Sequence, residues 1–516
     1  MSTPHPAASN PPQHPRSSPQ VPGRWRAAAA ATGLLRADGS VASTIFAEMT
    51  NLAARTGAIN LGQGFPDVDG PHAIKQAAIR AIEDGHNQYP PGTGIPELRR
   101  AVADHQRRHY GLDLDPDTEV LVTTGATEAL AATVLALAGP GDEVVTLEPF
   151  YDSHAAVVAL AGATHVTVPL HPTPDGFRLD PAQVRAAVGP RTRLVLVNTP
   201  HNPTGTVLTR TELQVVADAA RSVGAIVVTD EVYEHLVFDD AEHVPVATLP
   251  GMADHTITIS SAGKTFSFTG WKIGWLHGPA HLVEAVRTVK QFLTYTSGAP
   301  FQPAIAQALA DDEAPRALAA SLATRRDLLC EGLVAAGFEV VVPRGTYFVV
   351  ADGAPLGFDD GVELCRRLPD LAGVVGVPVS AFCRAPGAPG DVPDSPTTAR
   401  ALASRVRFTF VKREDVLRDA VGRLRALREC PERRLPACEV SADARQPLLD
   451  HGRRDRRSDL AGAGPGASVC PRRGVRPGRG VRALDRTRVR HHVGGCRGLV
   501  PGRRCVGGHA VPDRLG

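Results

Sequence analysis

Residues 194–205 read LVLVNTPHNPTG, an apolar run that ends in a polar segment rich in proline and glycine. A continuous Leu and Val run is typical of a strand buried on both faces, as strands are in parallel sheets. Four similar runs, rich in Val, Ile, Leu and Thr, occupy residues 119–123, 143–147, 225–229 and 256–260. Together the five runs predict an α/β fold with a mostly parallel central sheet.

The segments between these runs have the spacing of amphipathic helices, for example at residues 128–137 and 212–222. Beyond about residue 308 the pattern changes to longer helices with a few strands, which we expect at residues 339–342, 347–351 and 405–410. This change predicts a second, smaller α+β domain.

We therefore expect five segments along the 516 residues. They are a disordered Pro- and Ala-rich extension (1–38), an N-terminal arm that includes part of the small domain (39–75), a large domain (76–308), the small domain (309–429) and a disordered tail (430–516).

The charge of the chain is divided unevenly. The net charge is +2, but residues 431–516 contain 19 Arg, no Lys and 8 Asp or Glu, so the tail carries +11 and the remainder −9. The tail has no Phe, Tyr, Trp, Ile or Met and cannot build a core. Two interpretations remain open: a basic segment that binds nucleic acid, or translation of a GC-rich gene in a shifted frame from near Cys430, which we favour.

Composition also bears on the compartment. No stretch approaches the roughly 18 to 20 apolar residues of a membrane-spanning helix. The eight cysteines include no CxxC pair, and the three before the tail are expected to be buried thiols in a reducing compartment. Residues 24–31 imitate a signal peptide poorly, because alanine is only weakly apolar. We expect a cytoplasmic protein without membrane contact.

Three short polar motifs each follow a predicted strand: residues 198–205 (NTPHNPTG), 230–233 (DEVY) and 261–264 (SAGK). Open α/β sheets bind their ligands at the carboxyl ends of strands, so these motifs predict a site there. Taken singly, the first could be only a turn, and Asp230 only a helix cap. Their order and spacing make the set far more specific than any one of them.

Two other patterns do not predict sites. Residues 262–265 (AGKT) resemble the end of a phosphate-binding loop, but Thr258 stands where its first glycine would be. His105 and His109 lie one helical turn apart, but the residues between them offer no acidic third ligand. We expect these histidines on a solvated helix face, and we expect no metal.

The motifs resemble those of fold-type I enzymes of aminotransferase class I/II, which use pyridoxal phosphate (PLP). The resemblance runs from about residue 44 to about residue 427. Within this class, the sequence is most similar to the group of kynurenine/glutamine transaminase, methionine aminotransferase and N-succinyldiaminopimelate aminotransferase. It includes TIFAEM (44–49), INLGQGFPD (59–67), NQYP (87–90), TGATEA (124–129), EPFYD (148–152), GWKIGW (270–275) and RFTF (407–410).

The resemblance assigns residues to the PLP ring. It makes Lys264 the amine that binds the cofactor aldehyde as a Schiff base and later moves a proton as general acid and base. It pairs Asp230 with the pyridine nitrogen. It also places Asn202 and Tyr233 at the 3′-oxygen of PLP and Tyr151 against the ring face.

The resemblance likewise assigns residues to the cofactor phosphate, which needs backbone donors and positive charge. They are Gly125, Ala126 and Thr127 at a helix start, Ser261, Lys272, and Tyr89 from a neighbouring subunit. Many relatives carry Arg at the position of Lys272, and Lys lacks the bidentate fork of Arg. The role of Tyr89 implies a homodimer with shared active sites.

For the substrate, the resemblance implies that Arg407 grips the α-carboxylate, that Asn202 also binds the substrate, and that Gly64 belongs to a loop over the carboxylate. Tyr295 would line the pocket of the partner subunit. The alternative for Arg407 is a structural salt bridge. His201 either contacts the substrate or packs in the interior.

The implied function is transfer of an amino group from an amino acid to a 2-oxo acid in two half-reactions. The substrate side chain stays open among N-succinyldiaminopimelate, kynurenine, glutamine and methionine. One alternative on the same fold is a β-lyase that acts on cysteine S-conjugates. Another is a non-catalytic regulator, which would need a DNA-binding domain that 38 proline-rich residues cannot form.

Overall fold

The computed structural model describes residues 22–384 and 398–429. Residues 1–21 of the expected extension and the whole expected tail (430–516) lie outside the described residues. Within the described ranges, no helix combines the length and the apolar character that crossing a membrane requires.

An eight-stranded sheet forms the centre of the larger part of the fold, in the order β2-β9-β8-β7-β6-β3-β4-β5. Neighbours from β8 to β4 run parallel, whereas β2, β9 and β5 pair antiparallel. The mostly parallel sheet is confirmed, and the five predicted strands are β2, β3, β6, β7 and β8. The strand bounds are β2 Val120–Thr124, β3 Glu143–Glu148, β4 Thr164–Thr173, β5 Gly176–Leu179, β6 Thr192–Asn198, β7 Ile226–Asp230, β8 Thr256–Ser261 and β9 Ile273–His277.

Helices cover both faces of this sheet, which explains the continuous apolar runs. On β6, Leu194 and Leu196 join one buried cluster, and Val195 and Val197 join another. The first cluster includes α5 (Gly125–Leu137), α6 (Asp152–Ala161) and α10 (Ala280–Lys290); the second includes α8 (Arg210–Val223) and α7 (Pro181–Ala187). Around the β2 edge pack α3 (His72–Glu83), α4 (Pro96–Tyr110) and α11 (Phe301–Ala308).

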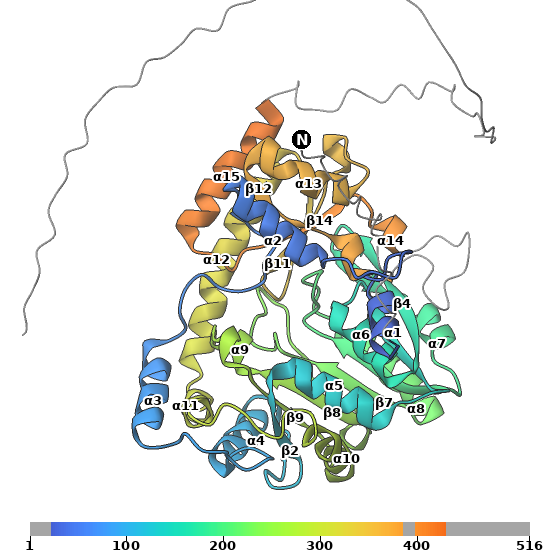
Figure 1. Cartoon of the computed structure of the whole chain (residues 1–516), viewed down its shortest axis with the longest axis vertical. Helices are drawn as coiled ribbons and strands as arrows, with labels where there is room; N and C mark the ends of the chain where they lie inside the picture. Colours follow the sequence, from blue (N-terminus) through green and yellow to red (C-terminus); the bar gives the residue numbers. More distant parts are fainter. Residues whose placement is uncertain (1–21, 385–397, 430–516) are drawn as a thin grey trace, which may run out of the picture. The chain divides into compact units, whose positions relative to one another are not determined.

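A second, antiparallel sheet has the order β10-β11-β14-β13. Figure 1 shows α12 running from α11 towards this sheet and α15, with α2 beside α13. Cys330 and Cys365 are buried free thiols in its core, as expected. A boundary at residue 308 coincides with the end of α11, and the division into two domains stays a prediction. The bounds are α2 Ile45–Thr56, β1 Ile59–Asn60, α12 Glu313–Ala336, β10 Glu339–Val341, β11 Phe348–Asp352, α13 Gly361–Ala372, β12 Val374–Val375, β13 Val377–Pro378, α14 Thr398–Ala401, β14 Arg405–Thr409 and α15 Glu414–Glu429.

The structure differs from the sequence prediction before residue 38. Residues Trp25–Ala31 form helix α1, which packs against α6, and Arg24 Nη1 donates to the Leu160 carbonyl at 2.8 Å. Five consecutive alanines favour a helix because alanine has the highest helix propensity. The prediction of disorder therefore fails for this part of the extension.

The solvated helix face predicted for His105 and His109 is wrong for His105, which is only 3% exposed. Its Nε2 atom lies 2.7 Å from the Nε2 of His235, a residue on the segment that follows β7. The fold thus adds a third histidine that spacing along α4 could not reveal. Burial, the largest cause, lowers the pKa of His105 to about 4.

Candidate active site

One cavity of about 440 Å³ gathers most of the residues that the sequence singled out. It lies where β6, β7 and β8 end side by side, with Asn198 in register with Asp230. Its lining includes twelve predicted site residues: Gly64, Gly125, Ala126, Thr127, Tyr151, Asn202, Asp230, Tyr233, Ser261, Lys264, Lys272 and Arg407. Tyr89 and Tyr295 are not among them.

Tyr89 and Tyr295 lie together at the surface. Tyr89 is 83% exposed and Tyr295 49%, and their rings meet edge to face with centroids 5.8 Å apart. Within a single chain, neither ring reaches the cavity that contains Lys264. His201, in contrast, is buried, and its Nδ1 lies 2.8 Å from Thr204 Oγ1, so it packs in the interior.

Lys264 lies on the short helix α9 (Ala262–Thr265), directly after β8. Its Nζ lies 5.9 Å from the ring centre of Tyr233 and 5.7 Å from that of Tyr347. Burial opposes the ammonium charge, but Tyr347, Tyr151 and Asp230 outweigh it and raise the pKa of Lys264. Among the described residues, no carboxylate forms an ion pair with this amine, so it is available to a ligand.

Tyr233 stays a neutral phenol. Burial, together with the neighbouring Tyr347, raises the pKa of Tyr233 well above its ordinary value. A buried phenol that keeps its proton can donate a hydrogen bond to a negatively charged oxygen of a ligand.

In the same cavity, Asp230 lies close to a histidine. His154 Nε2 is buried and lies 3.9 Å from Asp230 Oδ2, and among the described residues it has no hydrogen-bond partner. The main chain of Asp230 is fixed by Asn198, whose Nδ2 donates to the Asp230 carbonyl at 2.8 Å. This arrangement holds a carboxylate at the carboxyl end of β7, in the lining of the cavity.

The start of α5 provides donors for an anion. Gly125 opens this helix with φ at 73°, a conformation that favours glycine, and exposes the first N–H groups of the helix. Lys272 lies beside it, because a Cβ added to Gly125 would lie 3.4 Å from Lys272 Cδ. A Cβ on Gly274 would lie 2.6 Å from the carbonyl carbon of Gly125, so only glycine lets β9 approach the helix this closely.

Arg407 carries a buried positive charge on β14. Its side chain is enclosed, with Nη1 donating to Asn202 Oδ1 and Nη2 to the Gly62 carbonyl, both at 2.9 Å. Its Nε is buried without a partner, and among the described residues no carboxylate forms an ion pair with it. Burial lowers the pKa of Arg407 to about 10. The salt-bridge alternative is thus excluded for the described residues, and the guanidinium stays charged at neutral pH.

Aromatic rings enclose Arg407. The guanidinium carbon lies 3.9 Å from the ring centre of Phe348, 4.5 Å from Phe382 and 5.7 Å from Phe46. These rings stabilise the cation and keep water from it. A carboxylate bound here would therefore interact more strongly than in water.

Sequence reasoning missed several of these residues. His154 follows Tyr151 by three positions at the start of α6, and this proximity to a predicted site residue was the only available signal. Tyr347 donates from its hydroxyl to the Gly64 carbonyl at 2.6 Å, and so connects the small sheet to the loop over the cavity. Phe46, Phe348 and Phe382 come from three distant segments, which no spacing in the sequence brings together.

The fold and cavity are those of a known class of enzyme. The chain matches the family aminotransferase class I and II over residues 56–423, and it belongs to this family. It is 56% identical to the probable N-succinyldiaminopimelate aminotransferase of Mycobacterium tuberculosis over 391 residues, which cover 76% of this chain and 97% of that protein. The solved structure of the N-succinyldiaminopimelate aminotransferase from this organism superposes with a TM-score of 0.71, with 56% identity and coverage of 75% and 97%.

More distant relatives are named for other activities. The methionine aminotransferase of Escherichia coli is 38% identical and covers 75% of this chain and 96% of its own length. Kynurenine–oxoglutarate transaminase 3 of Mus musculus is also 38% identical and covers 73% and 86%. The chain is therefore an aminotransferase that acts on amino acid and oxo acid substrates, and enzymes of this class use PLP.

The cavity fits this cofactor. It offers the Lys264 amine, with which no carboxylate of the described residues forms an ion pair, and the Asp230 carboxylate with the buried His154 3.9 Å away. It also offers a helix start beside Lys272, with Ser261 at the end of β8. These groups match in chemistry the aldehyde, the ring nitrogen and the phosphate of PLP.

Proposed function

We propose that Lys264 holds PLP covalently and that Asp230, supported by His154, pairs with its ring nitrogen. Asn202 and Tyr233 would hydrogen-bond the 3′-oxygen, and Tyr151 would cover the ring. The start of α5, Ser261 and Lys272 would bind the phosphate. The lining of the cavity and the chemistry of these side chains support the assignment.

When bound, PLP supplies a ring that accepts the electron pair released as the substrate α-proton leaves. Arg407 would orient the substrate by its α-carboxylate, with Nε as the free donor and Nη1 fixed on Asn202. Lys264 Nζ would take the proton from the substrate α-carbon and deliver it to the cofactor. Tyr347 would keep the Gly64 loop over the carboxylate and exclude water.

For the amino donor we propose N-succinyldiaminopimelate, with a 2-oxo acid as acceptor. The 56% identity, spanning 97% of the length of the mycobacterial relative, supports this choice. The observation that carries the site assignment is that Arg407 is buried in the same cavity as Lys264 and forms no ion pair with any carboxylate of the described residues. It provides a site for the one α-carboxylate that every donor and acceptor shares.

The donor also carries distal carboxylates, and these need further cations. Among the described residues that line the cavity, the only Lys and Arg are Lys264, Lys272 and Arg407. The distal carboxylates must therefore be bound by residues outside this single-chain cavity. A dimer in which the partner subunit supplies them would meet this need.

A second candidate is an apolar or aromatic amino acid such as methionine or kynurenine. The observation in its favour is the wall of Phe46, Phe65, Phe348 and Phe382. The 38% identical methionine and kynurenine enzymes agree with this candidate.

The test is to compare kcat/KM for N-succinyl-LL-diaminopimelate, kynurenine, glutamine and methionine, each with a common 2-oxo acid. We expect the first donor to exceed the others by at least about tenfold, which corresponds to about 1.4 kcal/mol. A preference for kynurenine or methionine would replace it with the second candidate, and no transfer with any donor would reject the site assignment.

We also propose a homodimer with shared active sites, because Tyr89 and Tyr295 form an exposed aromatic pair outside their own cavity. Sedimentation should show a dimer. The Tyr89→Phe variant should release PLP faster than the wild type while remaining a dimer. A monomer with full activity would reject this proposal.

A further inference from the structure

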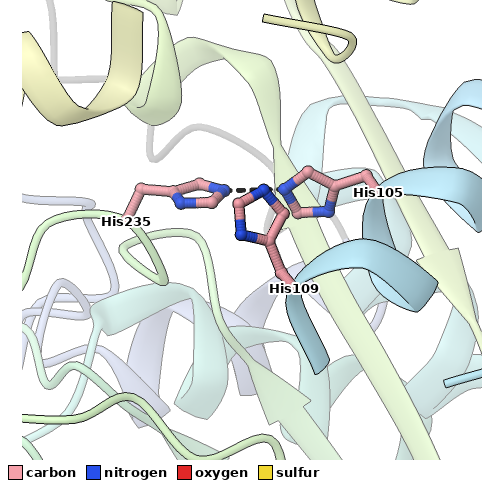
Figure 2. Close-up of side chains that lie close together, drawn as sticks. All are labelled: His105, His109 and His235. Atoms are coloured by element: carbon pink, nitrogen blue, oxygen red, sulfur yellow. Dashed lines mark hydrogen bonds between the residues drawn. The ribbon is translucent and has the colours of Figure 1, made fainter. Parts of the chain in front are cut away.

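A second cavity, of about 640 Å³, shares no lining residue with the Lys264 cavity and contains a cluster of histidines. His105 and His109 come from consecutive turns of α4, and His235 comes from the segment after β7. Figure 2 shows the three rings close together, with a hydrogen bond joining His105 directly to His235 and the His109 ring beside it. Their ring centres are 4.5 to 5.0 Å apart, and one nitrogen of each lies within 4.8 Å of the others.

This spacing is close to that of a metal site. Zinc binds imidazole nitrogen at about 2.0–2.1 Å, so tetrahedral ligands lie about 3.3 Å apart. His105 Nε2 and His235 Nε2 are 2.7 Å apart and share a hydrogen bond. Small side-chain rotations that separate these two nitrogens and draw His109 closer would make room for an ion.

A carboxylate stands next to the three histidines. Asp312 Oδ1 lies 3.0 Å from His109 Nε2 but is not within 4.8 Å of all three imidazole nitrogens, so its side chain would have to move towards His105 and His235 to become a fourth ligand. Arg108 holds the same carboxylate in place, with Nη2 3.0 Å from Oδ1. Three imidazoles and one carboxylate are a ligand set that suits zinc and related transition metals.

The surroundings can compensate the charge of a cation. Glu234 lines the same cavity, is 3% exposed and faces His105 and His235, and its carboxylate accepts hydrogen bonds from Ser260 and Tyr110. Gln106 Nε2 lies 3.3 Å from His105 Nδ1, and the buried Oε1 of Gln106 has no hydrogen-bond partner in the described part of the chain. Metal-bound histidines usually donate their second N–H to a carbonyl or carboxylate, and turning the Gln106 amide would supply this acceptor.

We propose that His105, His109 and His235, with Asp312 as fourth ligand, bind one divalent transition-metal ion such as zinc. The ion would tie α4 to the segment that begins at Asp230 and contains Tyr233. It would therefore stabilise the part of the Lys264 cavity that Tyr233 lines, without contacting the substrate.

The test compares full-length, untagged, PLP-loaded protein with His109→Ala and His235→Ala, with His171→Ala as control. His171 is an exposed histidine on β4 that contacts Gln183. After removal of metal with a chelator, each protein is titrated with zinc, and bound metal is counted. Cobalt(II) replaces zinc in a second titration, because its visible absorption distinguishes nitrogen and oxygen ligands from thiolates.

We expect each cluster variant to bind one zinc fewer per chain than the wild type and the His171 variant. The lost cobalt absorption should be that of nitrogen and oxygen ligands. His109 is partly exposed, so its variant keeps the test valid if His235→Ala does not fold. Histidines and cysteines of the tail would bind equally in all variants. Equal stoichiometry in the wild type and both cluster variants would overturn the proposal and leave a hydrogen-bonded histidine cluster.

Discussion

Replacement of Arg407 by Lys should sharply reduce the reaction with amino acids while leaving PLP bound. The guanidinium offers the buried, partnerless Nε beside two Nη atoms already fixed on Asn202 and Gly62. Lysine keeps the charge but cannot reproduce a bidentate grip on a carboxylate. It also loses the close contact with the Phe348 ring, whose centre lies 3.9 Å from the guanidinium carbon.

The magnitude follows from these losses. One charge-assisted hydrogen bond contributes about 1.5–3 kcal/mol, and the cation–π contact about 0.5–2 kcal/mol. A combined loss of about 2–5 kcal/mol corresponds to a fall in kcat/KM of about 30- to 5,000-fold. Rapid mixing of PLP-loaded enzyme with amino acid, followed by cofactor absorbance, measures this rate directly.

Two comparisons make the result specific. Arg405→Lys is the matched control, because Arg405 lies two residues earlier on β14 and pairs with Asp352 at 3.1 Å. This variant should react at nearly the wild-type rate. A second substrate, an amine with the same side chain as the amino acid but without its α-carboxylate, should react equally slowly with the wild type and with Arg407→Lys. A fall of less than about threefold with amino acids, or an equal fall with the amine, would refute the carboxylate role of Arg407.

Three further predictions concern the cofactor and the interior. Lys264→Ala should retain the far-ultraviolet circular dichroism of the wild type but lose the visible absorbance of PLP after desalting; retained absorbance would contradict covalent attachment. Gly274→Ala should raise the dissociation constant of PLP about tenfold or more, because the added Cβ would lie 2.6 Å from the Gly125 carbonyl carbon. Fluorescence titration measures this constant, and an unchanged affinity would contradict the anion site at α5. Burial lowers the pKa of His165 and His201 to about 3 and the pKa of His277 to about 4. Between about pH 6.5 and pH 4, these histidines therefore bind protons in the unfolded chain but not in the folded chain. The free energy of unfolding should therefore fall as pH falls through this window, by up to about 1.4 kcal/mol per pH unit for each histidine; urea unfolding measures it, and a flat profile would contradict the neutral buried state.

The large sheet could be predicted because its signal is local. Leu194, Val195, Leu196 and Val197 alternate between two buried faces, so both faces contribute to one continuous apolar run. The polar motifs after β6, β7 and β8 could be predicted to meet, because the strands are parallel neighbours. For these elements, sequence order and spatial order coincide.

The surroundings of the site could not be predicted in this way. Phe46, Phe348 and Phe382 converge on Arg407 only through the packing of α2 and the small sheet. His235 reaches His105 across 130 residues, and the spacing along α4 alone indicated a solvated face. Helix α1 was missed because the proline-rich residues before it dominated the composition of the extension.

We propose that Lys264 and Arg407 together make this chain an amino-group transferase for N-succinyldiaminopimelate. The most direct test is the absorption spectrum of the PLP-loaded protein before and after addition of N-succinyl-LL-diaminopimelate alone. We predict that the visible band converts to that of pyridoxamine phosphate and that a 2-oxo acid restores it. A folded protein whose bound PLP band is unchanged by this donor would contradict the account.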